Sequence, residues 1–420
     1  MCYETGIGKG EKMNQICLLK NMIQEYAWGS RTLIPNLLGN TAPSEKPQAE
    51  LWMGAHPKSP SLACYDGAWH PLDRLIQKYP VEILNEKVAG RYSSRLPYLF
   101  KILAAEKPLS IQAHPSRDQA AAGFERENLQ KIPIDAGNRN YRDANHKPEC
   151  ICALSTYWAL CGFRPIPEMQ ALFSKIQTPE LDPIIEKLSD RVESNRIPLF
   201  FQNLITWSPA ERASGLGKAV KKAEQYASQH PAFEWILRLH AEYGPDAGIL
   251  SPVFLNLVCL QPGQALFLFS GELHAYLSGL GIELMANSDN VLRGGLTPKH
   301  VDVNELIKIL RFEEKETDIL KPVSVGICEK VYSTWAEEFV LSVITLENGL
   351  SYESGTDRSV EILFCTDGRP TFINLKNGRQ TSISKGQSVM VPASIPRYRI
   401  EGEGILYKAG VPEVPEISSR

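Results

Sequence analysis

Residues 251–300 read SPVFLNLVCLQPGQALFLFSGELHAYLSGLGIELMANSDNVLRGGLTPKH, and this stretch decides the fold. Its apolar runs and turn residues predict a strand, a turn and a second strand. A single histidine, His274, follows the second strand, and a polar segment then ends in Arg293-Gly294-Gly295. The stretch therefore holds half of a chemical site, and the other half has to come from elsewhere in the chain.

The composition indicates an ordinary folded protein with more than one domain. The chain has 420 residues, of which 43% are hydrophobic and 22% charged, enough for two or three domains. A net charge of -3 gives no reason to expect nucleic acid or a membrane surface as partner. The nine cysteines show no C-x-x-C spacing, which predicts reduced thiols in a cytoplasmic protein. No apolar run reaches the ~18 residues that span a membrane.

Short apolar runs between proline, glycine and asparagine predict strands in the first 165 residues. Runs of this kind are typical of an all-β sandwich or barrel. They lie at Ile16–Leu19, Leu51–Met53, Leu99–Leu103 and Tyr157–Cys161. Helical turns are expected over Leu72–Lys78 and Ser116–Gln130, where Ser116 has the character of an N-cap.

The pattern becomes helical after Pro165. Prolines divide the segment into several short helices. We interpret residues 166–250 as a helical insertion in a β domain that comprises residues 1–165 and 251–319, with the strand pattern resuming at Val253. A further all-β stretch occupies residues 320–420.

A weak internal repeat links the two β stretches. The segment PGQALFLFSGELHAYLSGLG (262–281) aligns without gaps with KGQSVMVPASIPRYRIEGEG (385–404), and Arg397 falls where His274 falls. Chance also produces partial identities of this length. If the two are related, the second unit has lost a metal ligand and is structural. The sequence thus predicts a mainly β protein with two jelly-roll domains and an inserted helical domain.

Two upstream motifs supply candidate partners for His274. Gln112 and His114 are two apart in an apolar run, so on a strand both side chains face the same side. Glu149 opens the apolar run that follows Asn145-His-Lys-Pro, and a carboxylate that enters a buried strand needs a counter-charge or a metal. The alternatives are a solvated polar pair and an exposed tight turn, and His146 competes with Glu149 as a ligand.

Together, these residues make a metal site without thiolates. Its four nitrogen and oxygen ligands would be Gln112, His114, Glu149 and His274. Zinc accepts such ligands readily, and manganese, cobalt or iron are also compatible with them. Arg293, before two glycines, is suited to contact an anion, although a surface turn explains it as well. The segment GIGKGEK (6–12) lacks the strand and the ending of a phosphate loop, so we dismiss it.

Several blocks in the same order resemble the type I mannose-6-phosphate isomerases, metal-dependent enzymes of the cupin superfamily. The resemblance covers about residues 14 to 310, and the last hundred residues match only loosely. The blocks are YAWGS (26–30), AELWMGAHP (49–57), SIQAHP (110–115), NHKPE (145–149), GELHAYL (271–277) and NSDNVLRGGLTPKH (287–300).

The resemblance implies reversible conversion of mannose 6-phosphate and fructose 6-phosphate through an enediolate, on cupin-like β domains. One zinc ion per chain would be bound at the positions of Gln112, His114, Glu149 and His274. The family's active-site arginine falls on Arg293, and further pocket positions fall on Lys147, Glu283, Trp28, Glu50 and Ser110. We expect a monomer.

The roles within this site stay open at this point. Glu283 or a metal-associated group is the expected base, and Lys147 would move the oxygen proton. Arg293 would either hold the phosphate or stabilise the enediolate. The competing functions are a metal hydrolase, which no H-E-x-x-H helix supports, a metal-dependent dioxygenase, and a non-catalytic sugar-binding protein.

Overall fold

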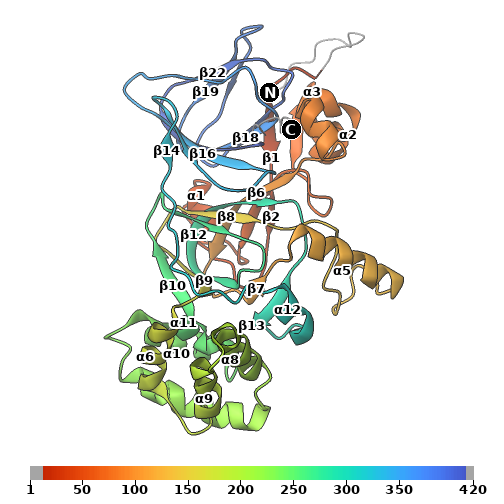
Figure 1. The fold of residues 1–420 in the computed structure, drawn as a ribbon. Coiled ribbons are helices and arrows are strands. Elements are labelled where there is room, and N and C mark those ends of the chain that lie inside the picture. The colour runs from red at the N-terminus through yellow and green to blue at the C-terminus, as the bar shows by residue number, and fades with distance from the viewer. Residues whose placement is uncertain (1–12, 413–420) are drawn as a thin grey trace.

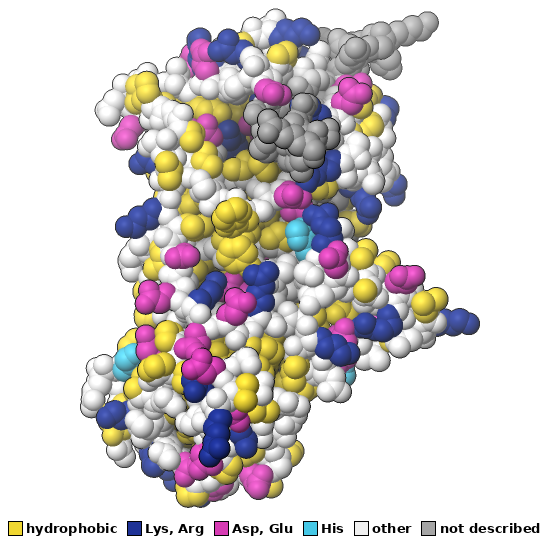
Figure 2. All heavy atoms as spheres, viewed as in Figure 1, with side chains coloured by type: hydrophobic (Ala, Val, Ile, Leu, Met, Phe, Trp, Pro, Cys, Tyr) yellow, Lys and Arg dark blue, Asp and Glu magenta, His cyan; other side chains and the backbone are white. Residues whose placement is uncertain are grey.

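The computed structural model describes residues 13–412, so the segment 6–12 lies outside the described residues. The chain is mainly β, with strands in the middle and upper parts of the molecule and a group of helices below them (Figure 1). Basic and acidic side chains are interspersed over the face shown in Figure 2, with hydrophobic side chains between them. Within residues 13–412, no helix combines the length and the apolar character needed to cross a membrane.

A ten-stranded sheet occupies the middle of the molecule and is organised around β12 (His274–Ala286). This strand pairs with four others, two along each of its halves. The remaining strands of the sheet are β2 (Met22–Gln24), β3 (Glu50–Met53), β6 (Tyr98–Ala105), β7 (Ile111–Ala113), β8 (Glu149–Ala153), β9 (Tyr157–Phe163), β10 (Leu255–Leu260), β11 (Ala265–Leu268) and β13 (Leu292–Gly295).

Two expectations for the stretch 251–300 were wrong. The strand expected from Val253 begins only at Leu255, because α11 (Ser251–Phe254) precedes it. Pro252 lies in the first turn of that helix, where its fixed φ suits the helix and its missing N–H costs nothing. The segment after His274 continues as a strand to Ala286, and there Gly279 (φ +130°) allows a close approach to Thr156.

The helices between the strands β9 and β10 gather at the bottom of the view in Figure 1. Four of them carry proline in the first turn, so the prolines that punctuate this segment begin helices. In α8, the side chains of Ile197, Phe200, Phe201 and Leu204 form one buried stripe at helical spacing. The elements are α6 (Ile166–Ile176), α7 (Asp182–Ile185), η1 (Glu186–Ser189), η2 (Glu193–Asn195), α8 (Arg196–Ile205), α9 (Pro209–Glu224), α10 (Pro231–Tyr243) and η3 (Ala247–Leu250).

A nine-stranded sheet takes strands from both ends of the chain. Its order is β14-β15-β16-β23-β18-β21-β1-β4-β5, and β1 (Cys17–Lys20) lies between β21 (Ser388–Val391) and β4 (Leu62–Tyr65). The other strands of this sheet are β5 (Ala68–Pro71), β14 (Val323–Ser324), β15 (Glu329–Tyr332), β16 (Val340–Leu346), β18 (Glu361–Gly368) and β23 (Gly404–Gly410). A four-stranded sheet completes the upper region with β17 (Tyr352–Glu353), β19 (Thr371–Asn374), β20 (Gln380–Ser382) and β22 (Tyr398–Glu401).

Short helices flank the sheets. The helix expected from Ser116 is α5 (Arg117–Leu129), and its N-cap is confirmed: the Ser116 hydroxyl accepts from the Gln119 N–H, while the Gln119 side chain accepts from the Ser116 N–H. The others are α1 (Leu33–Leu37), α2 (Leu72–Lys78), α3 (Pro80–Leu84), α4 (Glu86–Arg91) and α12 (Val303–Ile309).

The two halves of the sequence repeat have the same local structure at their start. The strands β11 and β21 occupy aligned positions, and the aligned glycines Gly263 and Gly386 both have φ of +84°. The halves differ where the histidine stands: His274 is fully buried, whereas Arg397 is exposed and pairs with Glu353 at 2.6 Å.

Candidate metal centre

Three buried side chains converge inside the ten-stranded sheet. His114 Nε2 lies 3.2 Å from Glu149 Oε1, and His274 Nε2 lies 3.7 Å from Glu149 Oε2. One potential ligand atom from each of the three lies within 4.8 Å of the other two. All three side chains are at most 2% exposed. This is the spacing of groups that could share one ion.

Strand pairing explains why these residues meet. His274 is the first residue of β12 and lies directly opposite Gln112 on β7. His114 follows β7 by one residue, and alternation places it on the same side as Gln112. Glu149 is the first residue of β8, which pairs with β12 farther along. The structure therefore brings Gln112 to the side of the three-residue cluster.

The two imidazoles are oriented from behind. Nδ1 of His114 lies 2.7 Å from the carbonyl of Asn290, and Nδ1 of His274 lies 2.9 Å from the carbonyl of Glu272. A carbonyl only accepts, so each Nδ1 carries the proton and each Nε2 keeps a free lone pair. Among the described residues, neither Nε2 has a hydrogen-bond partner, although both atoms are buried. A buried acceptor without a partner is costly, so the pair fits a metal ion.

The charge states in the metal-free protein also suit a cation. Burial, reinforced by the charge of Lys147, lowers the pKa of His114 to about 4, so the imidazole is neutral at physiological pH. Burial opposes ionisation of Glu149, but Lys147 and the two histidines hold its pKa well below the usual range. A neutral imidazole and an ionised carboxylate are the forms that bind zinc.

Lys147 lies beside the same carboxylate. Its Nζ is 2.9 Å from Glu149 Oε1, and the residue is 9% exposed. Tyr276 approaches from the opposite oxygen, donating to Glu149 Oε2 at 3.2 Å. The predicted pocket position at 147 is thus in direct contact with a candidate ligand.

A buried lysine that sequence reasoning missed joins two predicted pocket residues. Lys101 Nζ lies 2.7 Å from Glu283 Oε2 and 3.8 Å from Glu50 Oε1. Burial alone would lower the pKa of Lys101, but the two carboxylates raise it above its usual value. Trp52 Nε1 donates to the second oxygen of Glu50 at 2.5 Å. The signal was present: a lysine inside the apolar run Leu99–Leu103 needs a buried counter-charge.

Arg293 belongs to a group of three cations. It lies on β13 directly opposite Gln112. Burial and the nearby Arg142 lower the pKa of Arg293, and burial followed by both arginines lowers that of Lys299. Within residues 13–412, no carboxylate forms an ion pair with any of the three. Mutual repulsion without a counter-charge marks a place suited to an anion.

Three other sequence candidates lie apart from the cluster. Trp28 stacks on Tyr26 with ring centroids 5.8 Å apart, and Ser110 immediately precedes β7; in the described part of the chain neither side chain contacts the three-residue cluster. His146, the competing ligand, points to another region, where its Nε2 lies 2.8 Å from Glu338 Oε1.

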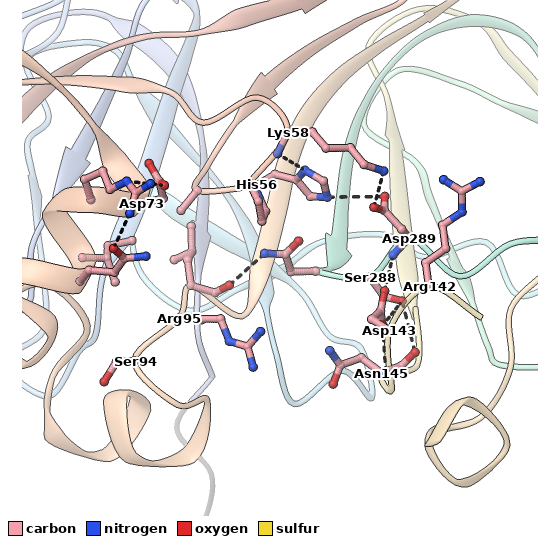
Figure 3. A pocket seen from close by; sticks show the side chains of 17 residues that line it. His56, Lys58, Asp73, Ser94, Arg95, Arg142, Asp143, Asn145, Ser288 and Asp289 are labelled. Carbon is pink, nitrogen blue, oxygen red and sulfur yellow. Dashed lines mark hydrogen bonds and ion pairs between the residues drawn. The ribbon is translucent and has the colours of Figure 1, made fainter. Parts of the chain in front are cut away.

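A polar pocket of about 470 Å³ lies beside this centre and shares a wall with it (Figure 3). His56, Lys58 and Asp289 form one edge, with Lys58 Nζ 2.7 Å from Asp289 Oδ2. The shared wall is the segment Ser288–Asn290, whose last carbonyl orients His114. Asp143, on the facing loop, accepts hydrogen bonds from Ser288 Oγ and the Asp289 N–H at 2.8 Å each.

Comparisons with known proteins agree with this architecture. Residues 16–166 match the family described as phosphomannose isomerase type I, catalytic domain, and residues 329–409 match the mannose-6-phosphate isomerase cupin domain. The mannose-6-phosphate isomerase of Escherichia coli (strain K12) is 38% identical over 391 residues, which cover 92% of this chain and 97% of that protein.

Solved structures give the same result. A mutant of phosphomannose isomerase from Salmonella typhimurium superposes with a TM-score of 0.87 at 35% identity, covering 94% of this chain and 99% of that one. A mannose 6-phosphate isomerase bound with zinc and yttrium superposes with a TM-score of 0.86 at 36% identity and the same coverage. These matches extend over nearly the whole chain and include both β regions. The chain belongs to the type I mannose-6-phosphate isomerase family of enzymes.

Proposed function

We propose that this chain interconverts mannose 6-phosphate and fructose 6-phosphate with the help of one divalent metal ion. The observation that carries the proposal is the pair of buried, partnerless Nε2 atoms of His114 and His274 on either side of Glu149. A structural histidine pair would turn these atoms toward protein donors instead.

We propose zinc as the ion, held by His114, Glu149 and His274 with Gln112 as fourth ligand. The donor set of two imidazoles, one carboxylate and one amide suits zinc. Gln112 supports this role because it lies opposite His274 in the strand pairing. A cation bound there supplies electrostatic stabilisation of the negative charge that develops on the substrate oxygens.

The proton transfers fall to side chains around this centre. Glu283 is the proposed base: burial raises its pKa, even though Lys101 opposes this shift. It would take the proton from C2 of the open-chain aldose, giving an enediolate, and return it to C1. Lys147, which lies beside the ligand Glu149, would move a proton from the C2 oxygen to the C1 oxygen. Lys101 would keep Glu283 and Glu50 in place.

The phosphate group is the proposed partner of the three cations. Arg293, Arg142 and Lys299 have no carboxylate counter-charge among the described residues, and the depressed pKa values of Arg293 and Lys299 are relieved by an anion. Arg293 starts at the strand position next to Gln112, so its long side chain would bridge the metal end and the phosphate end of one sugar. This supports phosphate binding over enediolate stabilisation as its role.

A coupled assay that follows fructose 6-phosphate formed from mannose 6-phosphate tests the proposal. Turnover should be lost on treatment with a strong chelator and return when zinc is added. Turnover that is insensitive to complete metal removal would overturn the metal-dependent mechanism. Consumption of oxygen in place of isomerisation would point to a dioxygenase.

The proposal also has the enzyme working as a cytoplasmic monomer with one zinc ion per chain. Metal analysis of the purified protein should give about one zinc per chain. Sedimentation at assay concentration should give the mass of a single chain, 46.9 kDa.

A further inference from the structure

We infer that Glu338, in the segment between β15 and β16, is a positioning residue for Lys147 and acts through His146. The inference rests on the proposed catalytic role of Lys147. Its basis is a contact between a late segment of the chain and the loop that carries Lys147 and the ligand Glu149.

Glu338 is a buried carboxylate that faces this loop. It is 5% exposed, and a single oxygen, Oε1, accepts from Arg117 Nη2 at 2.6 Å and from His146 Nε2 at 2.8 Å. The other oxygen, Oε2, is buried and has no hydrogen-bond partner among the described residues. A carboxylate can only accept, so the Nε2–H of His146 is directed at Glu338.

The segment that carries Glu338 is fixed by other contacts. Phe339 is 1% exposed and packs into a core shared with the strands of the ten-stranded sheet. Glu337 pairs with Arg91 at 2.6 Å, and its carbonyl accepts from the Tyr92 hydroxyl at 2.7 Å. The segment therefore stays in place without the Glu338 side chain, which leaves that carboxylate to hold the loop.

The loop has few ways to relax around Lys147. On one side, the Asn145 carbonyl accepts from Asn290 Nδ2 at 2.8 Å. On the other side, Pro148 fixes the backbone before Glu149. Between these anchors, the side chain of His146 is held by Glu338, and Lys147 follows directly. Loss of the Glu338 contact frees the backbone next to the lysine whose Nζ must stay 2.9 Å from Glu149 Oε1.

The test compares substitutions of Glu338 in two backgrounds, with kcat and KM for mannose 6-phosphate, metal content and thermal unfolding measured for each. Glu338→Ala should lower kcat by about 10-fold to 100-fold with KM changed less than about 3-fold, because misplacement of a catalytic group affects the transition state. Glu338→Gln should stay within about 3-fold of wild type. Its amide oxygen can replace Oε1, and its NH2 group takes the place of the oxygen that has no partner.

Glu337→Ala is the matched control, since it removes a carboxylate from the same segment. Its distance to Arg117 is 3.9 Å, and it makes no printed contact with the loop of His146. Its kcat should remain within about 2-fold of wild type. If Glu338→Ala does not fold, Glu338→Asp replaces it: the charge for Arg117 stays, the carboxylate retreats by one methylene, and kcat should still fall.

The decisive comparison uses His146→Ala as background. There, Glu338→Ala should lower kcat by less than about 2-fold, because a residue that acts through His146 has no further effect once His146 is gone. An equal loss in both backgrounds would overturn the inference while leaving the isomerase function intact. A Lys147→Met enzyme with wild-type kcat would instead overturn the proposed role of Lys147.

Discussion

His274 lies directly opposite Gln112 across the pairing of β12 with β7, and Arg293 lies opposite the same glutamine on the other side. One short strand of three residues, β7, therefore has a candidate metal ligand and a candidate anion-binding arginine as its two neighbours. This arrangement ties the metal end of the site to the phosphate end through backbone hydrogen bonds, and the predictions below separate the two.

His274→Ala should abolish both metal retention and isomerisation. Partners that only orient metal ligands contribute about 10-fold to 100-fold in affinity, so loss of a ligand should exceed that. Zinc per chain, measured after gel filtration, should fall well below that of the wild type, and turnover should fall to background. Arg397→Ala is the control: it changes the aligned position of the repeat, which is exposed and paired with Glu353. That variant should keep its metal and its activity.

Lys101→Met should cost both stability and activity. It leaves Glu283 and Glu50 buried without their cation, and removal of one partner from a buried pair typically costs about 3–5 kcal/mol in the free energy of unfolding. Adding Glu283→Gln should recover part of that free energy, measured by denaturant unfolding, but not the turnover. Recovery of turnover in the double variant would mean that the pair is structural only.

Arg142→Ala should raise KM for mannose 6-phosphate by about 10-fold or more with little change in kcat, as expected for a charge-assisted hydrogen bond to phosphate. Arg293→Lys should act in the same direction, because lysine keeps the charge but loses the planar fork. Neither change should affect binding of unphosphorylated mannose, measured by competition. A fall in kcat at constant KM for Arg293→Lys would assign this arginine to the transition state instead.

The metal-free enzyme should lose stability as the pH falls from 7 to 5. Burial and Lys147 lower the pKa of His114 from its ordinary 6.5 to about 4. Between these values the unfolded chain binds a proton that the folded chain does not, so the free energy of unfolding decreases as protons are added. The penalty is absent well above pH 6.5 and complete well below pH 4.

Thermal unfolding of the chelated protein at several pH values checks this. The melting temperature of His114→Gln should depend less on pH over the same range. An unchanged pH dependence in that variant would assign the effect to other groups, such as His274, whose pKa burial also lowers.

Local pattern was enough to find the metal side of the site. Alternation on a strand placed Gln112 and His114 on one side, and a glutamate at the entrance of an apolar strand, Glu149, needed a partner. The observed contacts of His114, Glu149 and His274 agree with that reasoning. The mainly β character with helices between residues 166 and 243 was predictable for the same reason, because hydrophobic period changes where the helices begin.

Contacts between distant segments were beyond such reasoning. Nothing near Lys101 in sequence names Glu283 as its partner, since the two meet only when β6 pairs with β12. The contact of His146 with Glu338 joins residues 192 apart. The strand register that creates these pairs is set by the packing of the whole sheet, which local periodicity does not encode.

The position of β1 between β4 and β21 sets a limit on when the protein can be finished during its synthesis. Chains fold largely from the N-terminus as they leave the ribosome. Here the first strand gains its second neighbour only after residues Ser388–Val391 have been made. A ribosome paused just before them would carry a chain that already contains every proposed metal ligand, yet whose opening strand still exposes one edge to aggregation. Complete synthesis, rather than completion of the metal ligands, is therefore the step that closes the molecule.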